Sequence, residues 1–279
     1  MPAKPPYGLF VTGTDTEIGK TYVSSIIVRD LVKAGHRVGV YKPLASDCVS
    51  DGREVQSEDA ILLWEAAGQP LTLEKVCPQR FKAPLSPHLA ARAEGREVDV
   101  DLVRSGLDEW TDHCDIVVVE GCGGLMSPLD DETYFADVAF DFGYPVVAVV
   151  DNRIGAINQA LQTTITASCF RDGLDVAGIV LNDAQAFEGD SSRKSNFEQI
   201  ANRSMVPVLT RVRHDADVCD NEVDWMAIAK KTAVLSTEYR VPSTVFGVRK
   251  FQSILLAPSR FLAGRCCEAY WRVATTRLR

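Results

Sequence analysis

The chain has 279 residues, 46% of them hydrophobic, and a formal net charge of −8 at pH 7. This length can bury a substantial core, and we expect one large α/β domain with an extension rather than two small domains. The acidic balance argues against a nucleic-acid binder, because such proteins carry a surplus of Lys and Arg. The longest apolar runs, such as PVVAVV at 145–150, are strand-sized and not the roughly 20 residues that span a bilayer, so no membrane association is expected.

The cysteines and histidines do not form a metal-binding or disulfide pattern. Eight cysteines are scattered without a C-x-x-C pair, and the four histidines do not cluster near them. We therefore expect neither a zinc site nor a disulfide framework, and we expect the protein to be cytoplasmic.

Short apolar runs alternate with longer amphipathic segments along the chain, which is typical of strands and crossover helices. Several runs are apolar on both faces, as in the buried strands of a parallel sheet. The predicted strands cover residues 8–12, 37–41, 115–120, 145–151, 176–182 and 206–210. The predicted helices cover residues 21–34, 57–68, 87–94, 101–112, 131–142, 157–171 and 194–203. The pattern predicts an α/β fold with a mostly parallel sheet flanked by helices.

The C-terminal end differs in charge from the rest of the chain. From Phe246 onward there are seven Arg or Lys and one acid, Glu268. This asymmetry predicts a main domain over residues 1–241 and a basic extension over 242–279. We expect a solvated, poorly ordered tail; a helix docked on the body, or attachment to a membrane or nucleic acid, are the alternatives.

A glycine-rich loop follows the first predicted strand. TGTDTEIGKT at 12–21 nearly matches the phosphate-binding pattern G-x-x-x-x-G-K-[ST], but the first glycine stands one position early and Thr14 takes its place. The loop opens a helix whose N-terminal N–H groups can bind phosphate. Lys20 can reach the phosphates, and the Thr21 hydroxyl can ligate Mg²⁺. The loop predicts a deviant Walker A motif and a P-loop NTPase fold; the alternative is a simple strand-to-helix turn.

Charged residues also lie at the ends of other predicted strands, and these ends meet at the same edge of the sheet. Glu120 ends the predicted strand DIVVVE and suggests a bound cation or charge partner. Lys42 ends the second strand, and together with Lys20 it would stabilise charge on a transferred phosphoryl group. Asp59 is a second candidate metal ligand. Taken alone, Lys42 could be a surface lysine, and Asp59 could only complement its helix dipole.

Six segments together closely resemble the dethiobiotin synthetases. They are FVTGTDTEIGKT (10–21), YKPLAS (41–46), SEDA (57–60), SPHLAA (86–91), VVVEGCGG (117–124) and VVDNRIGAIN (149–158). Their order and spacing agree with that family from about residue 8 to about residue 183. TGTDTE-x-GKT separates this family from related partition and nitrogenase-iron proteins, which carry KGG-x-GKT.

The resemblance implies an ATP- and Mg²⁺-dependent ligase that acts as a homodimer. Such an enzyme inserts CO₂, supplied as CO₂ or bicarbonate, between two amines of 7,8-diaminopelargonate. The products are dethiobiotin, ADP and phosphate, formed through a carbamate and a carbamic-phosphoric anhydride. ATP is the co-substrate and Mg²⁺ the cofactor.

Matching motifs assign roles to individual residues. The implied metal ligands are Thr21, Asp59 and Glu120. The implied catalytic residues are Lys42, Lys20 and Thr16. The implied substrate contacts are Thr16, Lys42, Ser46 and Asn158. The implied nucleotide-site residues are Glu17, Ile18, Gly19, Lys20, Thr21, Tyr22, Asp59, Glu120, Gly121, Cys122, Gly123, Asn182 and Asp183.

Some of these roles have open alternatives. Thr16 is expected to face the substrate and Glu17 the nucleotide, but both residues could only cap the following turn. Asn158 is expected to hold the substrate carboxylate at the partner subunit, or it could cap its helix. Cys122 replaces a small residue and is interpreted as packing rather than as a reactive thiol. Asn182 is expected to pair with the adenine base.

The match weakens beyond residue 183. PVLTRVRH at 207–214 keeps Pro207 but lacks the glycine and later proline of the family's P-L-L-G-x-I-P stretch, which leaves the preference for ATP open. Two other functions are alternatives. One is a non-catalytic nucleotide-sensing domain, which the retained Lys42, Asp59 and Glu120 disfavour. The other is a different ATP-dependent ligase, such as a cobyrinate amidotransferase, which would need a glutaminase domain with a Cys-His pair.

Overall fold

The structure is a computed structural model that describes residues 4–50, 54–186 and 189–230. The predicted basic extension, 242–279, and the end of the domain before it lie outside the described residues. No helix of the described residues is long and apolar enough to cross a membrane.

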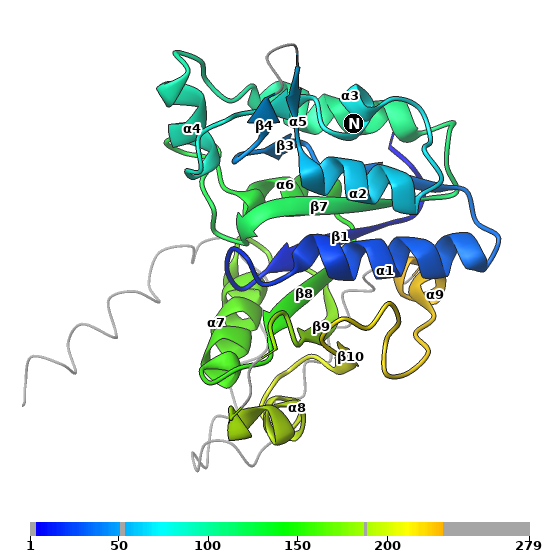
Figure 1. Cartoon of the computed structure of the whole chain (residues 1–279), viewed down its shortest axis with the longest axis vertical. Helices are drawn as coiled ribbons and strands as arrows, with labels where there is room; N and C mark the ends of the chain where they lie inside the picture. The colour runs from blue at the N-terminus through cyan, green and yellow to red at the C-terminus, as the bar shows by residue number, and fades with distance from the viewer. Residues whose placement is uncertain (1–3, 51–53, 187–188, 231–279) are drawn as a thin grey trace, which may run out of the picture. The chain divides into compact units, whose positions relative to one another are not determined.

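A six-stranded sheet with the order β10-β9-β8-β1-β7-β2 runs through the middle of the described domain (Figure 1). Every pairing within it is parallel, which confirms the predicted mostly parallel α/β fold. All six predicted strands are present, although the last one lies two residues later than predicted. The strands are β1 (Gly8–Gly13), β2 (Val38–Tyr41), β7 (Ile116–Gly124), β8 (Val146–Asp151), β9 (Val176–Asn182) and β10 (Val208–Val212).

Helices cover the sheet, and short strands lie beside it. Helix α1 packs on β1, β2 and β7, while α7 packs on β8 and β9. The helices are α1 (Lys20–Lys33), α2 (Glu58–Ala66), α3 (Leu73–Val76), α4 (Pro87–Ala93), α5 (Val100–Ser105), α6 (Phe135–Phe142), α7 (Ala156–Cys169), α8 (Asn196–Ala201) and α9 (Trp225–Lys230). Two 3-10 helices are η1 (Gly106–Trp110) and η2 (Ser191–Lys194). The short strand pairs are β3 (Leu44–Ala45) with β6 (Gln79–Arg80), and β4 (Val49–Ser50) with β5 (Val55–Gln56).

Helix α1 holds the phosphate-binding loop at one edge of the sheet. Its buried face includes Val23, Ile26, Ile27 and Leu31, the 3.6-residue spacing on which the prediction rested. The helix ends before Gly35, whose φ of 89° is a conformation that favours glycine.

Several predicted boundaries were wrong. The helix predicted over 131–142 begins only at Phe135, because the Asp130 side chain accepts hydrogen bonds from two backbone N–H groups and forms a turn there. The helix predicted over 101–112 becomes a 3-10 helix at Gly106, and the one predicted over 194–203 is preceded by η2. Glu120 does not end its strand. β7 continues to Gly124, which pairs with Gly13 of β1.

Candidate active site

The phosphate-binding loop is fixed by contacts of its own residues. Gly19 caps α1 in the left-handed region, with φ 77°. The Lys20 ammonium donates a hydrogen bond to the Asp15 carbonyl at 2.8 Å. The Asp15 carboxylate accepts one from the Thr16 backbone N–H, also at 2.8 Å. Asp15 therefore caps the turn, whereas the side chains of Thr16 and Glu17 are exposed at the rim of the loop.

We expect Gly19→Ala to weaken ATP binding about tenfold or more, because the left-handed backbone is unfavourable for alanine and the new methyl would overlap a neighbour. A Cβ at Gly19 would lie 2.3 Å from Nδ2 of Asn182. Calorimetric titration with ATP tests this. Gly35→Ala is the matched control, since Gly35 also has a positive φ, of 89°, but nothing within 4 Å of an added Cβ. Equal ATP binding by all three proteins would contradict the expectation.

Lys42 lies at the centre of a buried charge cluster. Its side chain is 2% exposed, and its ammonium contacts Oε1 of Glu120 and Oδ2 of Asp59, both at 2.6 Å. Glu120 is fully buried, and its Oε1 also accepts a hydrogen bond from the Thr21 hydroxyl at 2.8 Å. Four residues from separate segments of the chain, Thr21, Lys42, Asp59 and Glu120, are thereby joined. The possible interpretation of Lys42 as a surface lysine is wrong.

The charges of this cluster shift the protonation of its members. Burial by itself lowers the pKa of Lys42, but the carboxylates of Glu120 and Asp59 outweigh burial and raise the pKa above its ordinary value. Burial raises the pKa of Asp59, yet the Lys42 charge outweighs it and keeps the pKa low. Burial also lowers the pKa of Lys20, against the attraction of Glu120. Lys42 is therefore an ammonium and Asp59 a carboxylate at neutral pH.

The donor set of this cluster fits a magnesium ion. Mg²⁺ prefers oxygen ligands and commonly takes only one or two carboxylates from the protein, with water and phosphate completing its shell. Thr21, Asp59 and Glu120 offer one hydroxyl and two carboxylates. Oε2 of Glu120 is buried without a hydrogen-bond partner among the described residues, which is unusual for a carboxylate oxygen. With only two carboxylates, this set is not a group of three or more His, Cys, Asp or Glu, and no such metal-binding group occurs within the described part of the chain.

A cavity of about 800 Å³ opens over this cluster. It brings together many of the residues predicted for the site: Thr16, Glu17, Gly19, Lys20, Thr21, Tyr22, Lys42, Ser46, Asp59, Cys122 and Gly123. Ser46 and Cys122 face each other, with Oγ and Sγ 3.9 Å apart. Residues that were not predicted also line it: Asp47, Ser57, Glu58, Leu62, Pro84, Leu85, Ser86, Pro87 and Ser127. The motifs SEDA and SPHLAA contain four of these residues, Ser57, Glu58, Ser86 and Pro87, and could have indicated those four from the sequence.

The remaining predicted residues lie outside this cavity. Ile18 is part of the core, and Gly121 is buried in β7. Asn182 is 2% exposed and donates through Nδ2 to the Ile18 carbonyl at 2.8 Å. Asp183 is also buried. Asn158 is exposed in the first turn of α7, but Gly155 is the N-cap, so the alternative in which Asn158 caps this helix is wrong.

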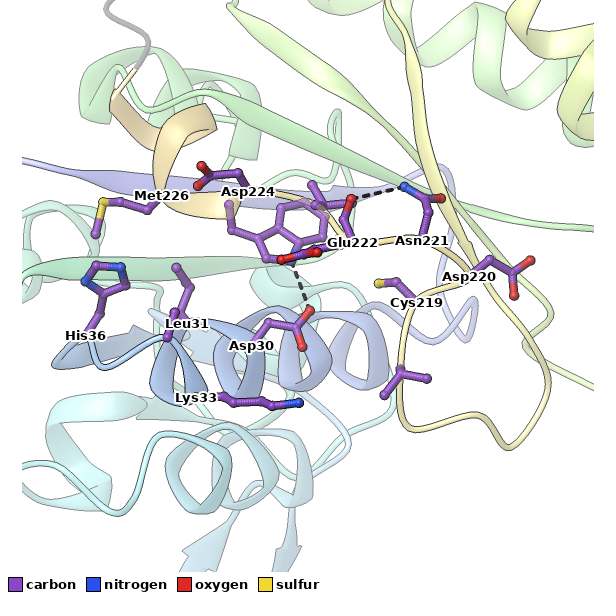
Figure 2. A pocket seen from close by; sticks show the side chains of 14 residues that line it. Asp30, Leu31, Lys33, His36, Cys219, Asp220, Asn221, Glu222, Asp224 and Met226 are labelled. Carbon is purple, nitrogen blue, oxygen red and sulfur yellow. Dashed lines mark hydrogen bonds between the residues drawn. The ribbon is translucent and has the colours of Figure 1, made fainter.

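A second cavity, of about 780 Å³, lies at the other end of α1 (Figure 2). Asp30, Lys33 and His36 line it from α1 and the following turn, and residues 218–226 line its opposite side. The indole of Trp225 donates a hydrogen bond to Asp30 at 3.2 Å, which ties α9 to α1. None of the predicted site residues is among those that line this cavity.

The parallel sheet, the glycine-capped loop at the start of α1 and the buried lysine–carboxylate cluster define a P-loop nucleotide-binding protein. A family profile described as an AAA domain matches residues 7–222. The ATP-dependent dethiobiotin synthetase BioD of Rhodopirellula baltica is 39% identical over 216 residues, covering 73% of this chain and 83% of that protein. The protein of the same name from Akkermansia muciniphila is 37% identical over 214 residues, covering 76% and 95%.

Solved structures that align with part of this chain include two FtsY proteins, both with TM-scores below 0.5. Chloroplast FtsY from Physcomitrella patens has a TM-score of 0.44 and 15% identity, with coverage of 76% of this chain and 60% of that chain. FtsY from Mycoplasma mycoides has a TM-score of 0.47 and 15% identity, with coverage of 76% and 62%. The chain thus spans about three fifths of the length of these structures.

The sequence relatives decide the family. The chain belongs to the ATP-dependent dethiobiotin synthetases, and it is accordingly an ATP-dependent ligase of biotin biosynthesis that forms C–N bonds.

Proposed function

We propose that this protein converts 7,8-diaminopelargonate, CO₂ and ATP into dethiobiotin, ADP and phosphate. The observation that carries the proposal is the Lys42 ammonium, held 2.6 Å from Glu120 beside the phosphate-binding loop. A buried cation at this place can act on a transferred phosphoryl group and on an anionic substrate at the same time. The cavity above it has room for a small diamine next to the terminal phosphate of ATP.

The nucleotide phosphates bind at the N-terminus of α1 in this proposal. The backbone N–H groups of residues 18–21 face the phosphates, and Lys20 exchanges its contact with the Asp15 carbonyl for a phosphate oxygen. Thr21, Asp59 and Glu120 hold Mg²⁺, which neutralises charge on the phosphates when bound. Glu17 and Tyr22 border the nucleotide from the rim of the loop.

Three bond-forming steps follow in the same cavity. One amine of the substrate attacks CO₂ and loses a proton, which gives a carbamate. The carbamate oxygen attacks the γ-phosphorus of ATP in line and displaces ADP. The second amine then attacks the carbonyl carbon of the resulting anhydride, so that the five-membered ureido ring closes and phosphate leaves. Lys42 stabilises the carbamate and the transferred phosphoryl group, and no side chain acts as a covalent nucleophile.

Other residues position the diamine. Thr16 and Ser46 line the same cavity as Lys42, and their hydroxyls can donate hydrogen bonds to, or accept them from, an amine or carbamate. The carboxylate tail of the substrate extends toward Asn158 of the partner subunit in a homodimer. The exposed position of Asn158, away from the cavity of its own chain, is compatible with a role across such an interface.

The test is turnover by the purified protein. ADP release should require Mg²⁺, bicarbonate and 7,8-diaminopelargonate together, and mass spectrometry should detect dethiobiotin. A protein that binds ATP tightly but forms no dethiobiotin would contradict the proposal and favour a nucleotide-sensing domain instead.

A further inference from the structure

A buried polar network lies at the carboxyl ends of β8, β9 and β10, beside the phosphate-binding loop. Its centre is Asp183, which directly follows β9 and is 5% exposed. The Arg211 guanidinium from β10 donates to Asp183 through Nε, at 3.2 Å to Oδ1 and 3.1 Å to Oδ2, and also through Nη2. Asn152, after β8, donates through Nδ2 to Oδ1 at 2.7 Å. Asn196 of α8 in turn donates to Oδ1 of Asn152 at 3.0 Å.

Both oxygens of Asp183 are used by donors from within the protein. The Arg211 fork and the Asn152 amide together satisfy the carboxylate, and the Asp183 backbone N–H donates to the Val212 carbonyl at 2.9 Å. A planar guanidinium that contacts both oxygens fixes orientation as well as distance. The point at which the chain leaves β9 is therefore held rigidly by β10.

The residue just before this anchor is Asn182, which contacts the phosphate-binding loop. Its Nδ2 donates to the Ile18 carbonyl, one residue before the cap of α1. One hydrogen of the amide nitrogen is used in this way, so the side chain keeps a second hydrogen to donate and its oxygen to accept. An amide that accepts from an exocyclic amino group and donates to N7 fits adenine, whereas guanine has a carbonyl oxygen in place of that amino group.

We propose that Arg211 is a positioning residue of the nucleotide site: by clamping Asp183 it holds the Asn182 amide in the orientation that favours ATP over GTP. The inference rests on the proposed function and on the expectation that Asn182 pairs with the adenine base. In the stretch 207–214 the sequence lacks the family's glycine and later proline, and Arg211 stands at the position that the family pattern P-L-L-G-x-I-P leaves open.

The experiment measures binding of ATP and of GTP, each with Mg²⁺, by calorimetric titration without the diamine. In Arg211→Met we expect the Kd for ATP to rise about tenfold and the preference for ATP over GTP to fall at least about threefold, since the fold-changes of one lost buried contact are of this size. Arg211→Lys keeps the charge but not the fork, so its preference should lie between those of the wild type and Arg211→Met.

Arg211→Met leaves a buried carboxylate unpaired and could unfold the domain. The double variant Arg211→Met with Asp183→Asn removes that charge while still removing the clamp. It should recover thermal stability and keep the reduced ATP preference. The matched control is Arg37→Met, because Arg37 also contacts an aspartate, Asp115, through Nε and Nη2, but at an exposed position at the opposite edge of the sheet. Its nucleotide preference should equal that of the wild type.

Lower thermal stability with an unchanged ATP-to-GTP ratio in the Arg211 variants would overturn the inference, because a purely structural role predicts that result. The turnover assay distinguishes this from a failure of the proposed function. A wild type that binds ATP but forms no dethiobiotin overturns the proposed function alone. A wild type that binds neither nucleotide overturns both.

Discussion

Lys42→Gln is expected to lower kcat by roughly 10²-fold or more, which is the usual loss when a preorganised electrostatic group is removed from an active site. The ammonium is buried between two carboxylates and proposed to stabilise both the carbamate and the transferred phosphoryl group. Glutamine keeps much of the volume and one donor but loses the charge. Steady-state measurement of ADP release with saturating diamine, bicarbonate and Mg-ATP gives kcat directly.

Lys75→Gln is the matched control for this substitution. Lys75 also pairs with a carboxylate at 2.6 Å, that of Glu109, but both side chains are about half exposed and the pair lies outside the cavity. Its kcat should stay within about twofold of the wild type, because exposed ion pairs contribute little. A folded Lys42→Gln protein with the kcat of the wild type would rule out the proposed catalytic role of Lys42.

The central sheet could be predicted from sequence because its strands are apolar and separated by helices of the right length. Each of the six predicted strands is present. The elements that were missed, such as α3 and α9, have four and six residues, which is less than the roughly two helical turns over which an apolar face repeats. The wrong start of α6 has a different cause. The Asp130 side chain replaces a helical turn by a hydrogen-bonded loop, and this competition is invisible in hydrophobic periodicity.

The charged residues of the site could be predicted where a parallel strand places one of them at the edge of the sheet. Lys42, Glu120 and the loop residues Lys20 and Thr21 meet because parallel strands share that edge. The sequence could not predict that Lys42 contacts both carboxylates or that Lys20 folds back onto the Asp15 carbonyl, because these contacts depend on side-chain rotamers. Arg211 was missed because its partner Asp183 lies 28 residues away and no known motif contains the two residues together.

Glu120→Leu is expected to destabilise the fold by about 3–5 kcal/mol as well as to abolish activity, because it leaves the buried Lys42 ammonium without its most buried partner. Asp59 remains in contact with Lys42, but Asp59 is half exposed and interacts with it through a more water-like medium. Chemical denaturation gives the free energy of unfolding, and the turnover assay gives kcat. Unchanged stability in Glu120→Leu would mean that water or Asp59 alone satisfies the buried lysine.

The double variant Lys42→Met with Glu120→Leu separates the two effects. Replacing both members of a buried ion pair by apolar groups of similar size is often neutral or stabilising, so the double variant should regain most of the lost stability. Its turnover should nevertheless stay at the level of the single variants, since the proposed charge stabilisation and the proposed metal ligand are both gone. Recovery of stability without recovery of activity would show that the ion pair serves the reaction and not the fold. A double variant as unstable as Glu120→Leu would instead show that the pair is required for the fold at this edge of the sheet.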